Sequence, residues 1–260
     1  TRVIANPEPK AIADLKIGDR VLAHDGTFTE VRRLFRRPYR GELVEIRTAY
    51  CDEPFQLTPN HEVLCGRKGE TGIHWKPAGE LAPSDFVLLP KLREVHDREH
   101  IAISSIVTRC SVKDGKARVP KVKWPLTDLV PVNADFMRFA GYYIAEGSMA
   151  VRGHLLQFSF SKKEEAYADD VLSLLDDLFG LKGKKLWIKN LCEVRVASVI
   201  LCEFVRDLFG TSASAKRLPD WMLYLPEEKL GAWLKGFWRG DGNTDRDGFR
   251  FHTTSEVLAC

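Results

Sequence analysis

The sequence predicts an α+β protein in which a β-rich segment precedes a segment of alternating helices and strands. Before residue 95, short runs of alternating apolar and polar residues are separated by Gly, Pro and Asp, a pattern typical of strands and turns. Beyond residue 133, apolar residues recur at helical spacing. A helical stretch that ends in an acidic residue and glycine also occurs twice, at 139–147 and 234–242. We therefore expect domains at 1–95 and 133–260.

The composition is that of an ordinary globular protein, with 44% apolar and 29% charged residues in a chain of 260. The formal charge of +3 is too small to indicate a nucleic-acid partner by itself. Six cysteines include no C-x-x-C pair and no zinc-like spacing, which favours reduced thiols. No run approaches the roughly 18 apolar residues of a membrane helix, and the first residues lack the pattern of a signal peptide. We expect a cytoplasmic protein without a membrane partner.

The strands expected in the first segment are short and are separated by turns. They cover residues 3–4, 20–23, 43–47, 55–57 and 86–89. Residues 96–132 are basic, contain three prolines and show no helical period. We interpret this segment as a connector or a DNA-contacting arm; a solvated linker is the alternative.

The second segment begins with a helix that Asn133 can cap and that ends near Gly147, a residue suited to a left-handed exit. A short strand is expected before a turn at Gly153. The following elements are a strand at 157–160, a helix at 168–179, strands at 185–189 and 192–197, and a helix at 198–209. The order is helix, two strands, helix, two strands, helix.

The stretch 225–243 repeats the first helix of this unit, in a second repeat that begins near residue 219. Small residues stand four apart in both helices, as Gly141 with Ala145 and Gly236 with Gly240. Such spacing puts them on one face, where two helix backbones can approach closely. A strand at 249–251 and a helix starting at residue 255 echo the first repeat. The second repeat is expected to be truncated at residue 260.

If the two repeats pack through these faces, Glu146 and Asp241 emerge side by side. Two carboxylates about 4 Å apart repel by roughly 4 kcal/mol at an effective dielectric constant near 20. Either a shared proton or a divalent cation can offset this repulsion. Lys162, at a strand end, is a candidate basic group for metal-assisted phosphodiester cleavage. The alternative is that both acids are solvated helix ends.

The stretches FAGYYIAEG and LKGFWRGDG resemble the paired motifs of the LAGLIDADG homing endonucleases. The resemblance implies an αββαββα fold, a monomer with pseudo-two-fold symmetry, and sheets that form a saddle on double-stranded DNA. It also implies that Glu146 and Asp241 bind Mg²⁺ and that Lys162 is the catalytic basic residue. The matching place in the second repeat holds Thr253 or Thr254, so a second lysine is missing there.

The first segment resembles the Hint domain of inteins, through TRVIANPEPKAIADLKIGDRVLAHDG, the later FQLTPNHEVLC, and GIHWKPAGELAPSDFVLLPK at 72–91. The family's Thr-x-x-His signature matches Thr58 and His61. An acyl shift at a peptide bond needs a proton donor to the leaving nitrogen, which His61 can supply while Thr58 orients the peptide. A structural turn with a satisfied histidine is the alternative for this motif alone.

Together the two resemblances predict an intein that combines autocatalytic protein splicing with site-specific cleavage of double-stranded DNA. Its partners would be DNA and the flanking host-protein segments, the exteins. The expected N-terminal nucleophile and C-terminal His-Asn pair fall outside the sequence, so we expect a chain incomplete at both ends. Alternatives are a DNA-binding module without cleavage and a relic that no longer splices. A secreted autoprocessing domain of the hedgehog kind is disfavoured by the endonuclease repeat.

Overall fold

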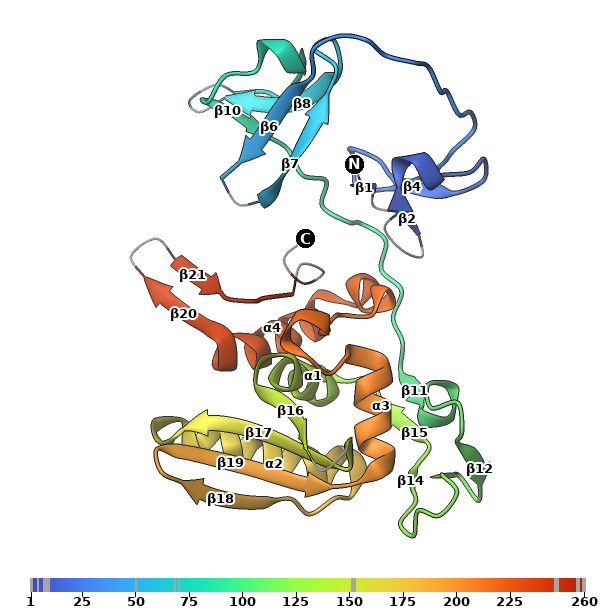
Figure 1. Ribbon diagram of the computed structural model, residues 1–260, viewed down its shortest axis with the longest axis vertical. Helices are drawn as coiled ribbons and strands as arrows, with labels where there is room; N and C mark the ends of the chain where they lie inside the picture. Colours follow the sequence, from blue (N-terminus) through green and yellow to red (C-terminus); the bar gives the residue numbers. More distant parts are fainter. Residues whose placement is uncertain are drawn as a thin grey trace. The chain divides into compact units, whose positions relative to one another are not determined.

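The computed structural model shows an α+β fold, as predicted (Figure 1). It describes residues 2–3, 5–6, 10–49, 51–67, 69, 71–150, 153–245, 248–255 and 258. The chain divides into two compact units, Thr1–Val95 and His96–Cys260. Within the described ranges, no helix has both the length and the apolar character needed to cross a membrane.

The first unit is built from small antiparallel sheets. They contain β1 (Arg2–Val3) with β3 (Lys10–Ala11); β2 (Ala5–Asn6), β4 (Arg20–Leu22) and β5 (Phe28–Glu30); β6 (Val44–Thr48) with β7 (Cys51–Leu57); and β8 (Glu62–Arg67) between β9 (His74–Pro77) and β10 (Asp85–Val87). Two single-turn helices, Ile12–Asp14 and Ala78–Glu80, interrupt the strands. Each strand expected from the sequence has a counterpart here, although Ile4 lies outside the described residues.

Residues 96–132, interpreted from the sequence as a connector or DNA-contacting arm, fold as part of the second unit and contain short strands. Strands β11 (His100–Ala102) and β15 (Leu129–Pro131) pair, and β12 (Ser111–Lys113), β13 (Lys116–Arg118) and β14 (Leu126–Thr127) form a second small sheet. Ile103 and Val107 are buried in the same cluster as the first long helix. The strands are only two or three residues long, too short to produce a readable period in the sequence.

The expected order of helices and strands is confirmed in the centre of the second unit. Its elements are α1 (Ala134–Glu146), β16 (Gly147–Ala150), β17 (Leu155–Ser161), α2 (Glu165–Phe179), β18 (Lys184–Ile188), β19 (Leu191–Ala197) and α3 (Val199–Phe209). The four strands form one antiparallel sheet in the order β16-β17-β19-β18. Asn133 caps α1 by accepting the Phe136 N–H at 2.9 Å, and Gly180 ends α2 at φ 64°.

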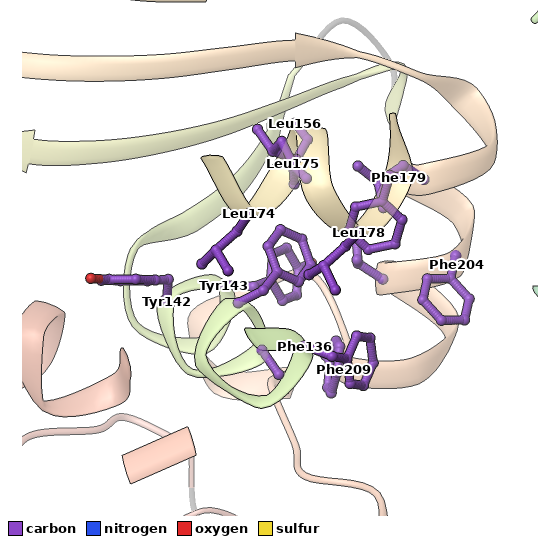
Figure 2. Packing of buried hydrophobic residues seen from close by; sticks show 14 of the residues in the cluster. Phe136, Tyr142, Tyr143, Leu156, Leu174, Leu175, Leu178, Phe179, Phe204 and Phe209 are labelled. Carbon is purple, nitrogen blue, oxygen red and sulfur yellow. The ribbon is translucent and has the colours of Figure 1, made fainter. Parts of the chain in front are cut away.

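One face of this sheet packs against the helices, because alternate side chains of each strand point the same way. Phe158 and Phe160 of β17 are buried together with Val194 of β19. The ring centres of Phe139 in α1 and Phe158 lie 5.8 Å apart, in one large buried cluster. Figure 2 shows other members of this cluster. The other face carries polar side chains, among them Gln157, Ser159, Glu193 and Arg195, which are only partly exposed.

The second repeat follows α3. A short helix (Asp220–Tyr224) leads to α4 (Glu227–Asp241), which is followed by the antiparallel pair β20 (Gly242–Asp245) and β21 (Gly248–Phe251). Pro226 is the N-cap of α4. Of the helix expected from residue 255, positions 256–257 lie outside the described residues.

Candidate functional site

Helices α1 and α4 pack backbone against backbone through their glycines. A β-carbon added at Gly141 would lie 2.6 Å from the Phe237 nitrogen. One added at Gly236 would collide with the carbonyl oxygen of Arg138 and lie 3.1 Å from the Tyr142 nitrogen. Only hydrogen fits at either place, so the predicted contact of small residues is confirmed.

The two helices end together, and both pass directly into a strand. The left-handed exit expected at Gly147 is wrong, because its φ is −70° and the equivalent Gly242 has φ −101°. Crowding requires glycine instead. A β-carbon at Gly147 would lie 2.5 Å from the Tyr143 carbonyl oxygen, and one at Gly242 would lie 2.5 Å from the Trp238 carbonyl oxygen. In both repeats, the passage from helix to strand is therefore too crowded for any residue other than glycine.

This packing brings the predicted acids, Glu146 and Asp241, into one electrostatic site. A β-carbon at Gly240 would lie 2.8 Å from Cγ of Glu146, which places Glu146 against the last turn of α4. Burial, followed by the charges of Asp241 and Glu164, raises the pKa of Glu146 to about 7. Burial also raises the pKa of Asp241. Both carboxyl groups are thus held where ionisation is unfavourable.

Lys216 is the basic group of this site, and the sequence did not indicate it. Its side chain belongs to a residue only 6% exposed, and Nζ donates to the Ile144 carbonyl at 2.7 Å. Burial lowers the pKa of Lys216 to about 8, whereas the charges of Asp241 and Glu146 raise it. Nζ also lies 5.4 Å from the centre of the Tyr143 ring. A desolvated ammonium is therefore held beside the two acids.

The loop that carries Lys216 is fixed by its own backbone. The Lys216 N–H donates to the Ser212 carbonyl at 3.0 Å, and the Arg217 N–H donates to that of Phe209 at 2.9 Å. Gly210 adopts φ 82° where α3 ends, and a β-carbon there would collide with Ala215. No local motif in the sequence marks this lysine, because its position depends on how α3 and α4 are joined.

His252 is a second group that the sequence did not indicate. Its N–H donates to the Asp241 carbonyl at 3.1 Å. Burial raises the pKa of the Asp241 carboxyl, whereas the charge of Lys216 and, to a smaller extent, that of His252 lower it. This residue follows β21 and lies one place before Thr253, in the region where the second repeat lacks a lysine.

Lys162 stands at the end of β17, as expected, in the short helix Lys162–Glu164. Its N–H donates to the Asn190 carbonyl at 3.1 Å, and Nζ lies 5.9 Å from the centre of the Trp187 ring. Its charge is not among those that shift the pKa of Glu146 or Asp241, whereas that of Lys216 is. The structure therefore groups Lys216 with the acids, and a catalytic role for Lys162 stays a prediction.

The donor set suits a hard divalent cation. Within the described ranges, no group of three or more His, Cys, Asp or Glu side chains is placed to hold a metal. Mg²⁺ needs fewer protein ligands, since it commonly uses one or two carboxylates together with water and substrate phosphate. Burial is the main cause of the raised pKa values of Glu146 and Asp241, and the charge of Lys216, which lowers both, does not fully offset it. A cation at this position would favour the ionised forms of both carboxyl groups.

On another side of α4, Arg239 ties the second repeat to the first. Its NH1 donates to Asp170 Oδ2 at 2.9 Å and to the Tyr142 hydroxyl at 2.7 Å. Asp170, on α2, also accepts from Arg138 at 3.0 Å and from the Tyr142 hydroxyl at 3.0 Å. The Arg239 guanidinium lies 5.0 Å from the centre of the Tyr167 ring. This network fixes the end of α4 that carries Asp241.

In the first unit, Thr58 and His61 lie on one turn between β7 and β8. The His61 N–H donates to the Thr58 carbonyl at 2.9 Å, and the Ala78 N–H donates to the His61 carbonyl at 2.8 Å. The turn borders an open pocket of about 900 Å³, which is lined by Thr58, Pro59, Asn60, His61, Glu62, Trp75, Pro77, Gly79 and Glu80. His61 is exposed toward solvent. The structure thus brings the two predicted residues together beside a cavity.

No protein-family model matches the chain. It is 28% identical over 98% of its length to an iron–sulfur cluster assembly SufBD family protein of Mycobacterium tuberculosis, of which it covers 30%. It is 28% identical over its whole length to an ATP-dependent DNA helicase of Thermococcus kodakarensis, covering 26% of that protein. A DNA-directed RNA polymerase subunit of Methanocaldococcus jannaschii is 27% identical over 82% of the chain, which covers 24% of the subunit.

The chain spans about a third or less of the length of the curated relatives that it matches. The names of these relatives refer to iron–sulfur cluster assembly, to a DNA helicase and to an RNA polymerase subunit. One stretch of sequence is therefore similar to a part of each of several proteins with different names.

Proposed function

We propose that this chain is part of an intein, in which the first unit rearranges peptide bonds and the second unit cleaves double-stranded DNA. The observation that carries the proposal is the meeting of Glu146 and Asp241 with Lys216 at the paired ends of α1 and α4. Partly buried acids with raised pKa values beside a buried lysine are typical of functional sites.

The chemistry of the second unit would be hydrolysis of a phosphodiester. Glu146 and Asp241 would hold Mg²⁺, which supplies Lewis-acid stabilisation of the developing charge. Lys216, whose pKa is about 8, is largely protonated at neutral pH and can stabilise negative charge on the phosphate. The polar face of the β16-β17-β19-β18 sheet offers Gln157, Ser159 and Arg195 toward a nucleic-acid partner. Resemblance of the helix motifs to LAGLIDADG endonucleases agrees with this arrangement.

The chemistry of the first unit would be an acyl shift at the junction with a host protein. His61 stands exposed at the open pocket of about 900 Å³, and its backbone is held by Thr58 and Ala78. The relatives support this assignment indirectly. A self-excising segment needs no functional relation to its host, so similarity to parts of proteins with unrelated names is expected.

Cleavage of DNA tests the proposal. The chain, expressed together with the coding sequence on either side, is incubated with Mg²⁺ and duplex DNA that carries the host gene without the insertion. We expect double-strand cutting at one site, and loss of at least 100-fold in rate for Glu146→Gln, since a metal ligand is removed. Asp177→Asn, which neutralises an exposed acid on α2, is the matched control and should cut normally. Equal cutting by Glu146→Gln would overturn the assignment.

A DNA-binding module without cleavage is the second candidate. It is favoured by Lys216, which already compensates part of the negative charge that a metal would otherwise neutralise. In that case, the chain would bind the same duplex with site preference, but neither Mg²⁺ nor Mn²⁺ would produce cutting. Glu146→Gln would then bind at least as well as the unmodified chain, because a negative charge is lost near the DNA.

A further inference from the structure

The segment 31–43, which we call the arginine loop, joins β5 to β6 without helix or strand (Figure 1). Connections of this length without secondary structure are uncommon inside compact domains and are often functional. The loop carries Arg32, Arg33, Arg36, Arg37 and Arg40, with Glu42 as its one acidic residue. Neither the peptide-bond chemistry nor the nuclease site described above uses it.

The net positive charge of the chain comes from this loop. The chain has 39 basic and 36 acidic residues. The loop holds five of the basic residues and one of the acidic residues. The remaining 247 residues therefore carry 34 basic and 35 acidic side chains, a formal charge of −1. Without the arginine loop the protein would be slightly acidic.

All five arginines are exposed, and in the part of the chain that the structure describes none forms an ion pair. Several arginines elsewhere are paired. Arg20 pairs with Glu94, Arg109 with Glu203 and Arg195 with Glu193, while Arg138 and Arg239 share Asp170. Like charges so close together repel each other. A ligand of high negative charge density would remove that repulsion.

The loop is anchored at its start and ordered near its tip. The Val31 N–H donates to the Asp19 carbonyl at 2.8 Å, and the Val31 carbonyl accepts the Gly18 N–H at 3.0 Å. Near the tip, the Tyr39 hydroxyl donates to the Glu42 carbonyl at 3.0 Å. A β-carbon at Gly41 would lie 2.8 Å from that hydroxyl oxygen, so the Tyr39 ring folds over Gly41.

Large apolar side chains lie between the charges. Phe35 is 74% exposed, and Leu34 and Tyr39 are each 52% exposed. Basic side chains interleaved with aromatic rings are typical of surfaces that contact nucleic acid, where guanidinium groups bind phosphates and rings pack on sugars or bases. A loop that only needed solubility would not expose these rings.

We propose that the arginine loop binds the phosphate backbone of DNA, an inference that rests on the proposed function only in naming DNA as the partner. Guanidinium groups bind phosphates through two parallel hydrogen bonds, which lysine cannot do. Residues 32–40 span at most roughly 30 Å when extended. A duplex presents on the order of 18 phosphates over that length. An acidic protein surface would instead need carboxylates placed to match five particular arginines.

Salt dependence of DNA binding tests the inference. The affinity for a random-sequence duplex is measured by fluorescence anisotropy at several NaCl concentrations, with the five arginines unchanged, replaced by Gln, or replaced by Lys. Each lost phosphate contact reduces the slope of log K against log salt by about 0.9, so the Gln variant should lose a slope of up to about 4.5. The Lys variant should keep most of the slope. An unchanged slope in the Gln variant would overturn the inference.

Two further measurements distinguish this inference from the cleavage proposal and from a loop that is covered by another protein segment. The titrations contain EDTA, so they measure binding without cleavage, and Asp177→Asn, which changes an exposed acid on α2, should retain the salt slope of the unmodified chain. A failure of the cleavage proposal therefore leaves the loop assignment standing. Modification of arginines by phenylglyoxal, located by mass spectrometry, should be fast in the loop without DNA, slow with DNA, and fast again at 1 M NaCl. Protection without DNA would contradict the inference, because another protein segment would then cover the loop.

Discussion

Gly141 of α1 and Gly236 of α4 lie so close that the backbone of each helix occupies the space a side chain on the other would need. This contact sets the separation of the helix ends at Glu146 and Asp241, five residues beyond each glycine. The relationship between the two glycines therefore determines whether the acids meet.

Alanine at these positions should separate the helices. For Gly236→Ala the added methyl group meets the Arg138 carbonyl, which belongs to rigid backbone, and we expect a loss of about 1–3 kcal/mol or more in the free energy of unfolding. Gly231→Ala on the same helix is the matched control. No atom lies within 4 Å of its added β-carbon, so the change should stabilise by roughly 0.5–1 kcal/mol. Urea denaturation measures both, and equal effects would contradict the close contact.

The pKa of Glu146 predicts a pH-dependent cost to stability. Because folding raises this pKa from 4.5 to about 7, the protonated carboxyl is the favoured form in the folded chain. The associated stability is fully present below pH 4.5 and is lost as the pH rises to about 7. Glu146→Gln cannot ionise and should therefore gain on the order of 2–3 kcal/mol over the unmodified chain at pH 8, but little at pH 4.5. Urea denaturation without divalent cations at both pH values checks this, and a pH-independent difference would contradict it.

The Arg239–Asp170 pair should act on the position of Asp241 as well as on stability. Arg239→Gln leaves α4 without its link to α2, so we expect weaker binding of Mn²⁺ by about 3- to 10-fold, a factor equivalent to roughly 0.7–1.4 kcal/mol. Arg138→Gln is the matched control, because it removes another partner of Asp170 without releasing α4. It should lower the free energy of unfolding and leave Mn²⁺ affinity nearly unchanged. Isothermal titration calorimetry distinguishes the two, and equal losses of affinity would show a purely structural role.

In the first unit, His61→Ala should block cleavage at the N-terminal junction when the chain is expressed between host segments. His61 is the proposed proton donor, so the precursor should persist on a denaturing gel. His74→Ala is the control, since His74 lies on β9 near Cys65 and outside the pocket. Normal processing by His61→Ala would remove the histidine from the mechanism.

Most helices and strands of the second unit could be predicted from the sequence because local residue patterns mark them. Asn133, Ser198 and Gly180 mark helix ends, and the alternation along β17 and β19 marks the buried face of the sheet. The repeat made the contact of α1 with α4 predictable. Gly147 was misjudged because a C-terminal glycine commonly adopts a left-handed conformation, whereas here the ring and carbonyl of Tyr143 exclude any side chain.

Lys216 could not be found in this way. It lies in a loop without periodicity, 70 residues after Glu146. It joins the acids only because the loop folds back on the end of α3 and Nζ reaches the Ile144 carbonyl of α1. Residues 96–132 posed a similar problem, since their core contacts depend on strands too short to show a pattern. Local chemistry predicts elements well, but a site formed by distant residues needs the tertiary structure.

We propose that Glu146 and Asp241 together form one divalent-cation site. Counting bound Mn²⁺ by electron paramagnetic resonance at pH 7.5 tests this most directly, with the unmodified chain, Glu146→Gln, Asp241→Asn and the control Asp177→Asn. We predict that the unmodified chain and Asp177→Asn share a site that either of the other two substitutions weakens by at least 10-fold. A site that survives in both Glu146→Gln and Asp241→Asn would contradict the claim.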